Sequence, residues 1–151
     1  MGKKRADPNW RQLRETLWVR CDGFCEVSGR PLDFETFDAH HRRPKGMGGT
    51  YRPDTDTAAN LLALDPEVHN GASWSVHQRP SWSRPRGYLL RNVVEEARLE
   101  PLLYRGRTWM ILDEEGTMGE LSNRSQRYLW RTLEQTQGYV PAARPARSQY
   151  R

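Results

Sequence analysis

Three of the four histidines of this chain lie within thirty residues of one another, with an asparagine between them. His40 and His41 are adjacent, Asn60 follows, and His69 comes nine residues after the asparagine. Adjacent residues on a strand point to opposite faces, so the first two imidazoles are poorly placed to bind one ion together. Phosphodiester hydrolysis needs two such separate groups, because one binds a cation at the phosphate while the other activates water. Neutral imidazole, with a pKa of about 6.5, can do either task at cellular pH.

The wider pattern around these histidines is His-His-x-x-Pro, then Gly-Gly, then Asn-Leu-x-x-Leu and a last His. The residues in it are His40, His41, Pro44, Gly48, Gly49, Asn60, Leu61, Leu64 and His69. This pattern resembles the signature of the HNH nuclease family over about residues 20–90. The resemblance implies that His40 and His69 bind one divalent cation and that His41 is the general base. It also implies that Asn60 braces the loop of the base, although in some members this residue approaches the metal.

A third metal ligand is harder to assign. Many HNH proteins place a second His four residues after the last motif His, where this chain has Ser73, so His77 is the candidate. A continuous helix would hold His69 and His77 about 12 Å apart, too far for two ligands that each lie about 2 Å from one ion. Either the helix breaks at Asn70-Gly71, which the residues favour, or His77 is a surface histidine near DNA. Asp38 shares the face of His40 and is expected to orient it; a solvated acid at the strand end is the alternative.

The metal is expected to be a single catalytic ion. The resemblance implies Mg²⁺ or Mn²⁺, with Ni²⁺ or Zn²⁺ also able to bind, and two or three histidines suit a softer ion. Many relatives also hold a structural zinc with four cysteines, which map here to Cys25, Ser28, Asp65 and Val68. Because only one thiolate remains, no zinc knuckle is expected. Cys21 and Cys25 are expected to be small buried apolar residues, and a zinc site that includes both is the alternative.

Double-stranded DNA is the expected partner. The net charge of +5 and the pI of about 9.6 favour a polyanion, although a GC-rich genome would also raise the arginine content. Basic residues after the histidine pair, and one after His77, are expected to meet phosphates, with a solvated charged face as the alternative. These residues are Arg42, Arg43, Lys45 and Arg79.

The expected fold is α+β, with a small ββα-metal (HNH/His-Me finger) core, a flanking N-terminal helix and a C-terminal β-hairpin/helix extension. The expected organisation is a disordered basic arm (1–8), an HNH nuclease domain (9–92), a C-terminal extension packed on it (93–135) and a disordered basic tail (136–151). The expected elements are a helix over 8–20, a hairpin over 24–32, a strand over 37–41, an apolar segment over 61–64, short helices from 65 and over 73–77, strands over 87–90, 102–104 and 108–112, and a helix over 125–134.

The expected activity is metal-dependent hydrolysis of DNA by an HNH endonuclease. Analogy with phage proteins adds a role in bacteriophage genome packaging, with the terminase as a partner. No apolar run approaches about 18 residues, and the basic N-terminus lacks the apolar region of a secretory signal. A cytoplasmic protein with no membrane partner is therefore expected. The alternatives are a catalytically inactive HNH-like DNA-binding module and a toxin nuclease with an immunity partner.

Overall fold

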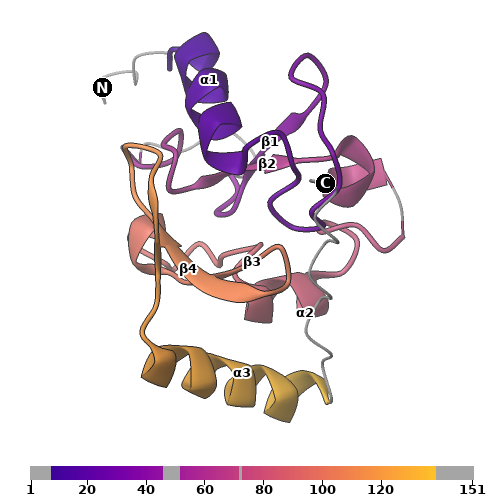
Figure 1. Ribbon diagram of the computed structural model, residues 1–151, viewed down its shortest axis with the longest axis vertical. Coiled ribbons are helices and arrows are strands. Elements are labelled where there is room, and N and C mark those ends of the chain that lie inside the picture. The colour runs from indigo at the N-terminus through magenta and orange to yellow at the C-terminus, as the bar shows by residue number, and fades with distance from the viewer. Residues whose placement is uncertain (1–7, 46–51, 72, 139–151) are drawn as a thin grey trace, which may run out of the picture.

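The computed structural model describes residues 8–45, 52–71 and 73–138. The fold is α+β, with helices and two small antiparallel sheets (Figure 1). Its main elements are α1 (Trp10–Cys21), β1 (Asp38–His41), β2 (Leu61–Leu64), η1 (Glu67–Gly71), α2 (Pro80–Ser83), η2 (Arg84–Arg86), η3 (Ala97–Leu99), β3 (Leu102–Tyr104), β4 (Thr108–Leu112), β5 (Met118–Glu120) and α3 (Asn123–Gln137). The expected arm up to residue 7, the glycine-rich part of the loop after Lys45 and the tail beyond 138 lie outside the described residues.

The first sheet pairs β1 with β2, and α1 packs on it through a small apolar core. β1 and β2 are antiparallel, with His40 opposite Leu62 and His41 opposite Leu61. Leu17 and Cys21 of α1 are fully buried in the same cluster as Leu61. The helix begins two residues later than expected, at Trp10, because the side chain of Asn9 caps it by accepting a hydrogen bond from the Gln12 amide.

The second sheet has the order β3-β4-β5, and α3 lies along it (Figure 1). The strands expected over 102–104 and 108–112 are confirmed, and β5 adds a third strand that the sequence pattern missed. Leu133 of α3 is buried, and Trp130 meets Trp109 of β4 edge-on with ring centroids 6.3 Å apart. The expected tail is wrong for residues 136 and 137, which continue α3.

Two further expectations for local structure are wrong. Residues 73–77 form turns, and residues 87–90 form a turn and an irregular segment in place of a strand. Gly87 has a φ of 77°, and a Cβ there would lie 2.1 Å from the Pro101 carbonyl oxygen. The glycine therefore permits a close turn that brings residues 87–90 against the end of β1, where the Leu90 amide donates to the Arg42 carbonyl over 2.7 Å.

A buried ion pair joins α1 to β2. Arg20 makes two 2.8 Å hydrogen bonds to the carboxylate of Glu26, and it also donates to the carbonyls of Ala58 and Leu61. Glu26 in turn accepts from the Ala63 amide. Burial opposes the charge on Arg20, but the Glu26 carboxylate outweighs it and raises the pKa of Arg20 above its usual value.

Arg42 is the largest of the fully buried side chains in the described part of the chain, so the expectation that it meets DNA phosphates is wrong. Its guanidinium has five N–H donors and five backbone carbonyl acceptors. The acceptors are the carbonyls of Gly87, Ala59, Ala97, Glu100 and Pro101, at 2.8–3.2 Å. Desolvation lowers the pKa of Arg42 to about 9, which leaves it protonated at neutral pH.

Arg43 is also structural, and its expected contact with phosphate is likewise wrong. Its side chain is 3% exposed and forms an ion pair with Asp54. It also donates to the carbonyls of Val94 and Glu95. Together, the two arginines attach the residues after β1 to the segment that runs from Gly87 to Pro101.

Every helix in the described ranges is too short or too polar to cross a membrane.

We expect Arg42→Met to lower the free energy of unfolding by at least about 3 kcal/mol, because five backbone carbonyls lose the hydrogen bonds that Arg42 donates. Urea denaturation measures this change. Arg11→Met is the control, since the Arg11 side chain is 89% exposed, and its effect should stay below about 0.5 kcal/mol. A similar loss in both variants would contradict the structural role of Arg42.

Candidate metal centre

Three histidines from three different segments meet at one point. His40 comes from β1, His69 from η1 and His77 from the turns that follow. Their ring centroids are 5.0, 5.0 and 4.9 Å apart, a nearly equilateral triangle. One ligand nitrogen from each lies within 4.8 Å of the other two, so the group could hold a metal ion.

The ring of His40 is fixed by a backbone acceptor. Its Nε2 lies 2.7 Å from the Tyr88 carbonyl oxygen, so Nε2 carries the proton and donates it there. Nδ1 then has the lone pair, and it is buried with no hydrogen-bond partner. A buried nitrogen without a partner is costly, and a metal ion would satisfy it. Burial lowers the pKa of His40 to about 3, which keeps the ring neutral, as a ligand must be.

His69 is oriented by Asp38, and this corrects the expectation that Asp38 orients His40. The Nδ1 atom of His69 lies 2.8 Å from Asp38 Oδ2. Asp38 and His40 do share a face of β1, but His40 already uses the Tyr88 carbonyl. The carboxylate holds the Nδ1 proton of His69 and directs Nε2 to the centre of the triangle, an arrangement common behind metal-bound histidines.

The chain returns on itself to bring His77 beside His69. The helical turn η1 ends at Gly71, in agreement with the expected break at Asn70-Gly71. The Val76 amide donates to the Val68 carbonyl over 2.8 Å, and the His77 amide donates to the His69 carbonyl over 3.3 Å. The two Nε2 atoms are consequently 3.1 Å apart. Tetrahedral ligands on a Zn²⁺-sized ion lie about 3.4 Å apart, so a small shift would admit one.

His41 is not part of this triangle, and it pairs with a carboxylate that the sequence pattern did not reveal. Its Nε2 lies 2.7 Å from Oδ1 of Asp56, and its side chain is 19% exposed. When Nε2–H donates to Asp56, the lone pair lies on Nδ1, as a general base requires. Asp56 sits in an irregular polar stretch, where no periodicity or spacing marks it.

Asn60 is fully buried and bonds to a residue near each member of this pair. Its Oδ1 accepts from the Arg43 amide, and its Nδ2 donates to the carbonyls of Arg43 and Thr55. Arg43 follows shortly after His41, and Thr55 directly precedes Asp56. Asn60 therefore sets the spacing between His41 and Asp56.

The two parts of the site open on one hollow of about 210 Å³. Its lining residues are Ala39, His41, Pro44, Lys45, His69 and His77. Lys45 lies at its edge, 3.3 Å from Asp56 and 38% exposed, where it can also meet an anion. Arg79 does not line this hollow; it lies over the Trp82 ring on a separate pocket, and its contact with DNA stays a prediction.

The positions of the family's zinc knuckle are used for packing and hydrogen bonds. Cys21 and Cys25 are fully buried with free thiols, which confirms the expectation of small buried residues. The Ser28 amide lies 3.5 Å from the Cys25 sulfur. Asp65 accepts from the Glu67 amide at the start of η1, and Val68 packs in the core.

We expect Zn²⁺, Ni²⁺ or Mn²⁺ to stabilise the wild-type protein, by about 2.7 kcal/mol at a hundred times the dissociation constant. His69→Ala should lose most of this stabilisation, because it removes a ligand. The neighbouring His41→Ala is the matched control and should keep it. Thermal unfolding with and without metal measures the effect, and full stabilisation of His69→Ala would contradict the site.

The metal-free protein should lose stability as the pH falls below about 6.5. Between that value and about 3, His40 binds a proton in the unfolded chain and not in the folded one, so unfolding is favoured. His40→Gln keeps an amide that can donate to Tyr88 but does not titrate. From pH 6 to pH 4, the wild type should lose up to about 1.4 kcal/mol per pH unit more than this variant. Parallel curves from urea denaturation in EDTA would refute the assignment.

Comparisons with protein-family models, with curated proteins and with solved structures found no match to this chain. The evidence that bears on its function is therefore the residues of the motif and their arrangement in space. That arrangement consists of three converging imidazoles, a fourth imidazole paired with a carboxylate, and one hollow on which both open.

Proposed function

We propose that this chain is a metal-dependent endonuclease of the HNH type that hydrolyses phosphodiester bonds in double-stranded DNA. The observation that carries the proposal is the shared hollow. His41, whose Nε2 is hydrogen-bonded to Asp56, lines the same hollow as His69 and His77. A phosphate in that space would meet a cation site and a base from two sides, as hydrolysis needs.

The local fold supports the same proposal. β1 and β2 form an antiparallel pair, and η1 follows directly after β2. This order is compatible with a ββα core of the HNH type, in which η1 would take the place of the helix with a single wide turn. The histidine geometry also supports the proposal, since the rings of His40 and His69 lie 5.0 Å apart while His41 pairs with Asp56.

In the proposed reaction, His41 takes a proton from a water molecule, and the oxygen of that water attacks phosphorus. The proton arrives on Nδ1, and the resulting imidazolium is stabilised by the Asp56 carboxylate on Nε2. A divalent ion held by His40, His69 and His77 would polarise the phosphate and stabilise the charge on the leaving oxygen. Lys45, at the rim, offers a further positive charge to the phosphate.

The donor set bears on which ion serves. The three candidate ligands in the described residues are all imidazoles. Such a set suits Zn²⁺, Ni²⁺ or Co²⁺ better than Mg²⁺, which prefers oxygen ligands. Mn²⁺ lies between these classes. We propose that the softer ions bind more tightly. A place in phage genome packaging, with a terminase as partner, rests on the resemblance alone.

We expect His41→Ala to slow the cleavage of supercoiled plasmid at least about 100-fold, because the general base is lost, while metal-linked stabilisation is unchanged. Asp56→Ala should slow it by on the order of tenfold or more through loss of the partner of the imidazolium. The assay is run across Mg²⁺, Mn²⁺, Co²⁺, Ni²⁺ and Zn²⁺. If the wild-type protein cuts with none of these ions but still binds DNA and metal, the chain is a catalytically inactive DNA-binding module.

A further inference from the structure

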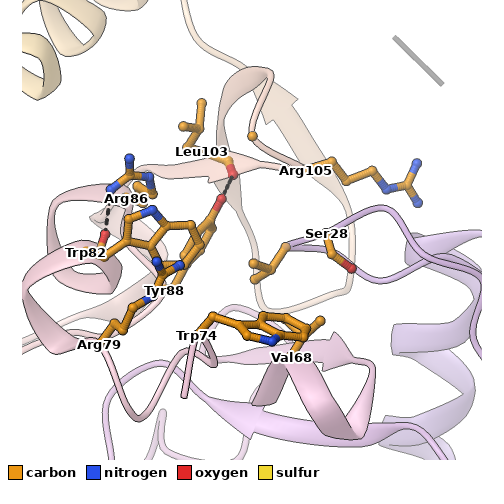
Figure 2. A pocket seen from close by; sticks show the side chains of 11 residues that line it. Ser28, Val68, Trp74, Arg79, Trp82, Arg86, Tyr88, Leu103 and Arg105 are labelled. Carbon is orange, nitrogen blue, oxygen red and sulfur yellow. Dashed lines mark hydrogen bonds between the residues drawn. The ribbon is translucent and has the colours of Figure 1, made fainter. Parts of the chain in front are cut away.

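A second pocket lies behind the metal centre and has a different chemistry. Its volume is about 450 Å³, within the range of roughly 300–1,000 Å³ that is usual for small-ligand sites. Apolar and aromatic side chains form most of its wall (Figure 2), and none of the described lining residues is acidic. The residues that the argument uses are Val68, Trp74, Arg79, Trp82, Arg86 and Tyr88.

The aromatic wall offers a surface for a flat ring. Trp74 is 38% exposed. The guanidinium of Arg30 lies 5.0 Å from its ring centroid, and Trp74 lines the pocket while Arg30 does not. Figure 2 shows Trp82 and Tyr88 on one side of the pocket and Ser28 across from them.

The charge of the pocket favours an anion attached to that ring. Arg79 and Arg86 both lie over the Trp82 ring, 4.5 and 4.6 Å from its centroid. Arg86 is buried and donates to the Trp82 carbonyl. Arg79 is exposed, and no carboxylate partner for it occurs in the described part of the chain. Its guanidinium is therefore available to a phosphate at the rim.

The pocket shares its walls with the metal centre. Tyr88 lines the pocket with its side chain, while its carbonyl fixes the ring of His40. Val68 lines the pocket directly before His69, and Trp74 lies in the return segment between His69 and His77. A group seated in the pocket would consequently touch the same chain segments that carry His40, His69 and His77.

From this arrangement we infer that the pocket binds one unpaired nucleotide of the DNA strand, with its base on Trp74 and its phosphate on Arg79. This inference rests on the proposed nuclease function. A base can present its face to an aromatic side chain only when it leaves the helical stack, and such stacking tolerates any sequence. The enzyme would then favour DNA with a flipped, frayed or single-stranded nucleotide beside the cut. The aromatic wall beside Arg79 and Arg86 favours a ligand that joins a flat ring to an anionic group, as a nucleotide does, over an acidic peptide.

Fluorescence polarisation with a labelled oligothymidylate, in EDTA so that nothing is cut, tests the assignment. Trp74→Ala should weaken binding of the single strand by about tenfold, the cost of one lost base stack. It should leave the affinity for a blunt duplex within about twofold. Tyr128→Ala is the matched control, because Tyr128 is an aromatic residue on α3 that is 68% exposed. Arg79→Gln should also weaken single-strand binding, and Arg11→Gln should not.

Three results would overturn the assignment. These are unchanged binding by Trp74→Ala, an equal loss for the single strand and the duplex, and displacement of the labelled strand by an acidic tryptophan-containing peptide as effectively as by unlabelled DNA. Plasmid cleavage without an effect of Trp74 would overturn the pocket and leave the nuclease proposal intact. An effect of Trp74 on the single strand without cleavage by any ion would support the pocket and overturn only the nuclease proposal.

Discussion

One buried guanidinium fixes the relation between the two halves of the site. Arg42 directly follows the histidine pair and satisfies all of its N–H groups with backbone carbonyls. A buried cation with no carboxylate in its hydrogen-bond shell is tolerated because five carbonyl dipoles replace its hydration. Among its acceptors is Gly87, which precedes Tyr88, and the Tyr88 carbonyl in turn sets the tautomer of His40. The hydrogen bonds of Arg42 thus hold in place the backbone that sets the protonation state of His40, a candidate ligand.

Three of the four histidines illustrate how the second nitrogen of an imidazole decides what the first can do. A carbonyl from Tyr88 holds His40, a carboxylate from Asp38 holds His69, and a carboxylate from Asp56 holds His41. The neutral acceptor suits the deeply buried ring, because a carboxylate there would favour protonation. The anionic acceptor suits the base, because it stabilises the charge that proton transfer creates.

The sequence predicted which histidines lie close together better than it predicted the contacts that hold them in place. Strand alternation separated His40 from His41, and simple helix geometry showed that His77 needed a break after His69. Burial decided the rest. Charged residues in a loop usually lie at the surface, so the sequence predicts that Arg42 and Arg43 contact phosphate. Both side chains are instead buried by packing against residues 87–101. A backbone carbonyl acceptor such as that of Tyr88 has no signature in the side chains, and the apolar run after Gly87 resembles a strand where the chain forms a turn that depends on Gly87.

The segment after His69 contributes His77 to the candidate metal centre and Trp74 to the neighbouring pocket. Two backbone hydrogen bonds close it, from Val76 to Val68 and from His77 to His69. Ser83 reinforces the closure by donating to the Val76 carbonyl over 2.7 Å. Because the same closure places His77 at the triangle and Trp74 at the pocket, a change in its length would move both together. A loop that supplied only a ligand would need no indole at the pocket wall. Under the proposed function, Trp74 would contact the same nucleic-acid strand whose phosphate reaches the candidate metal centre.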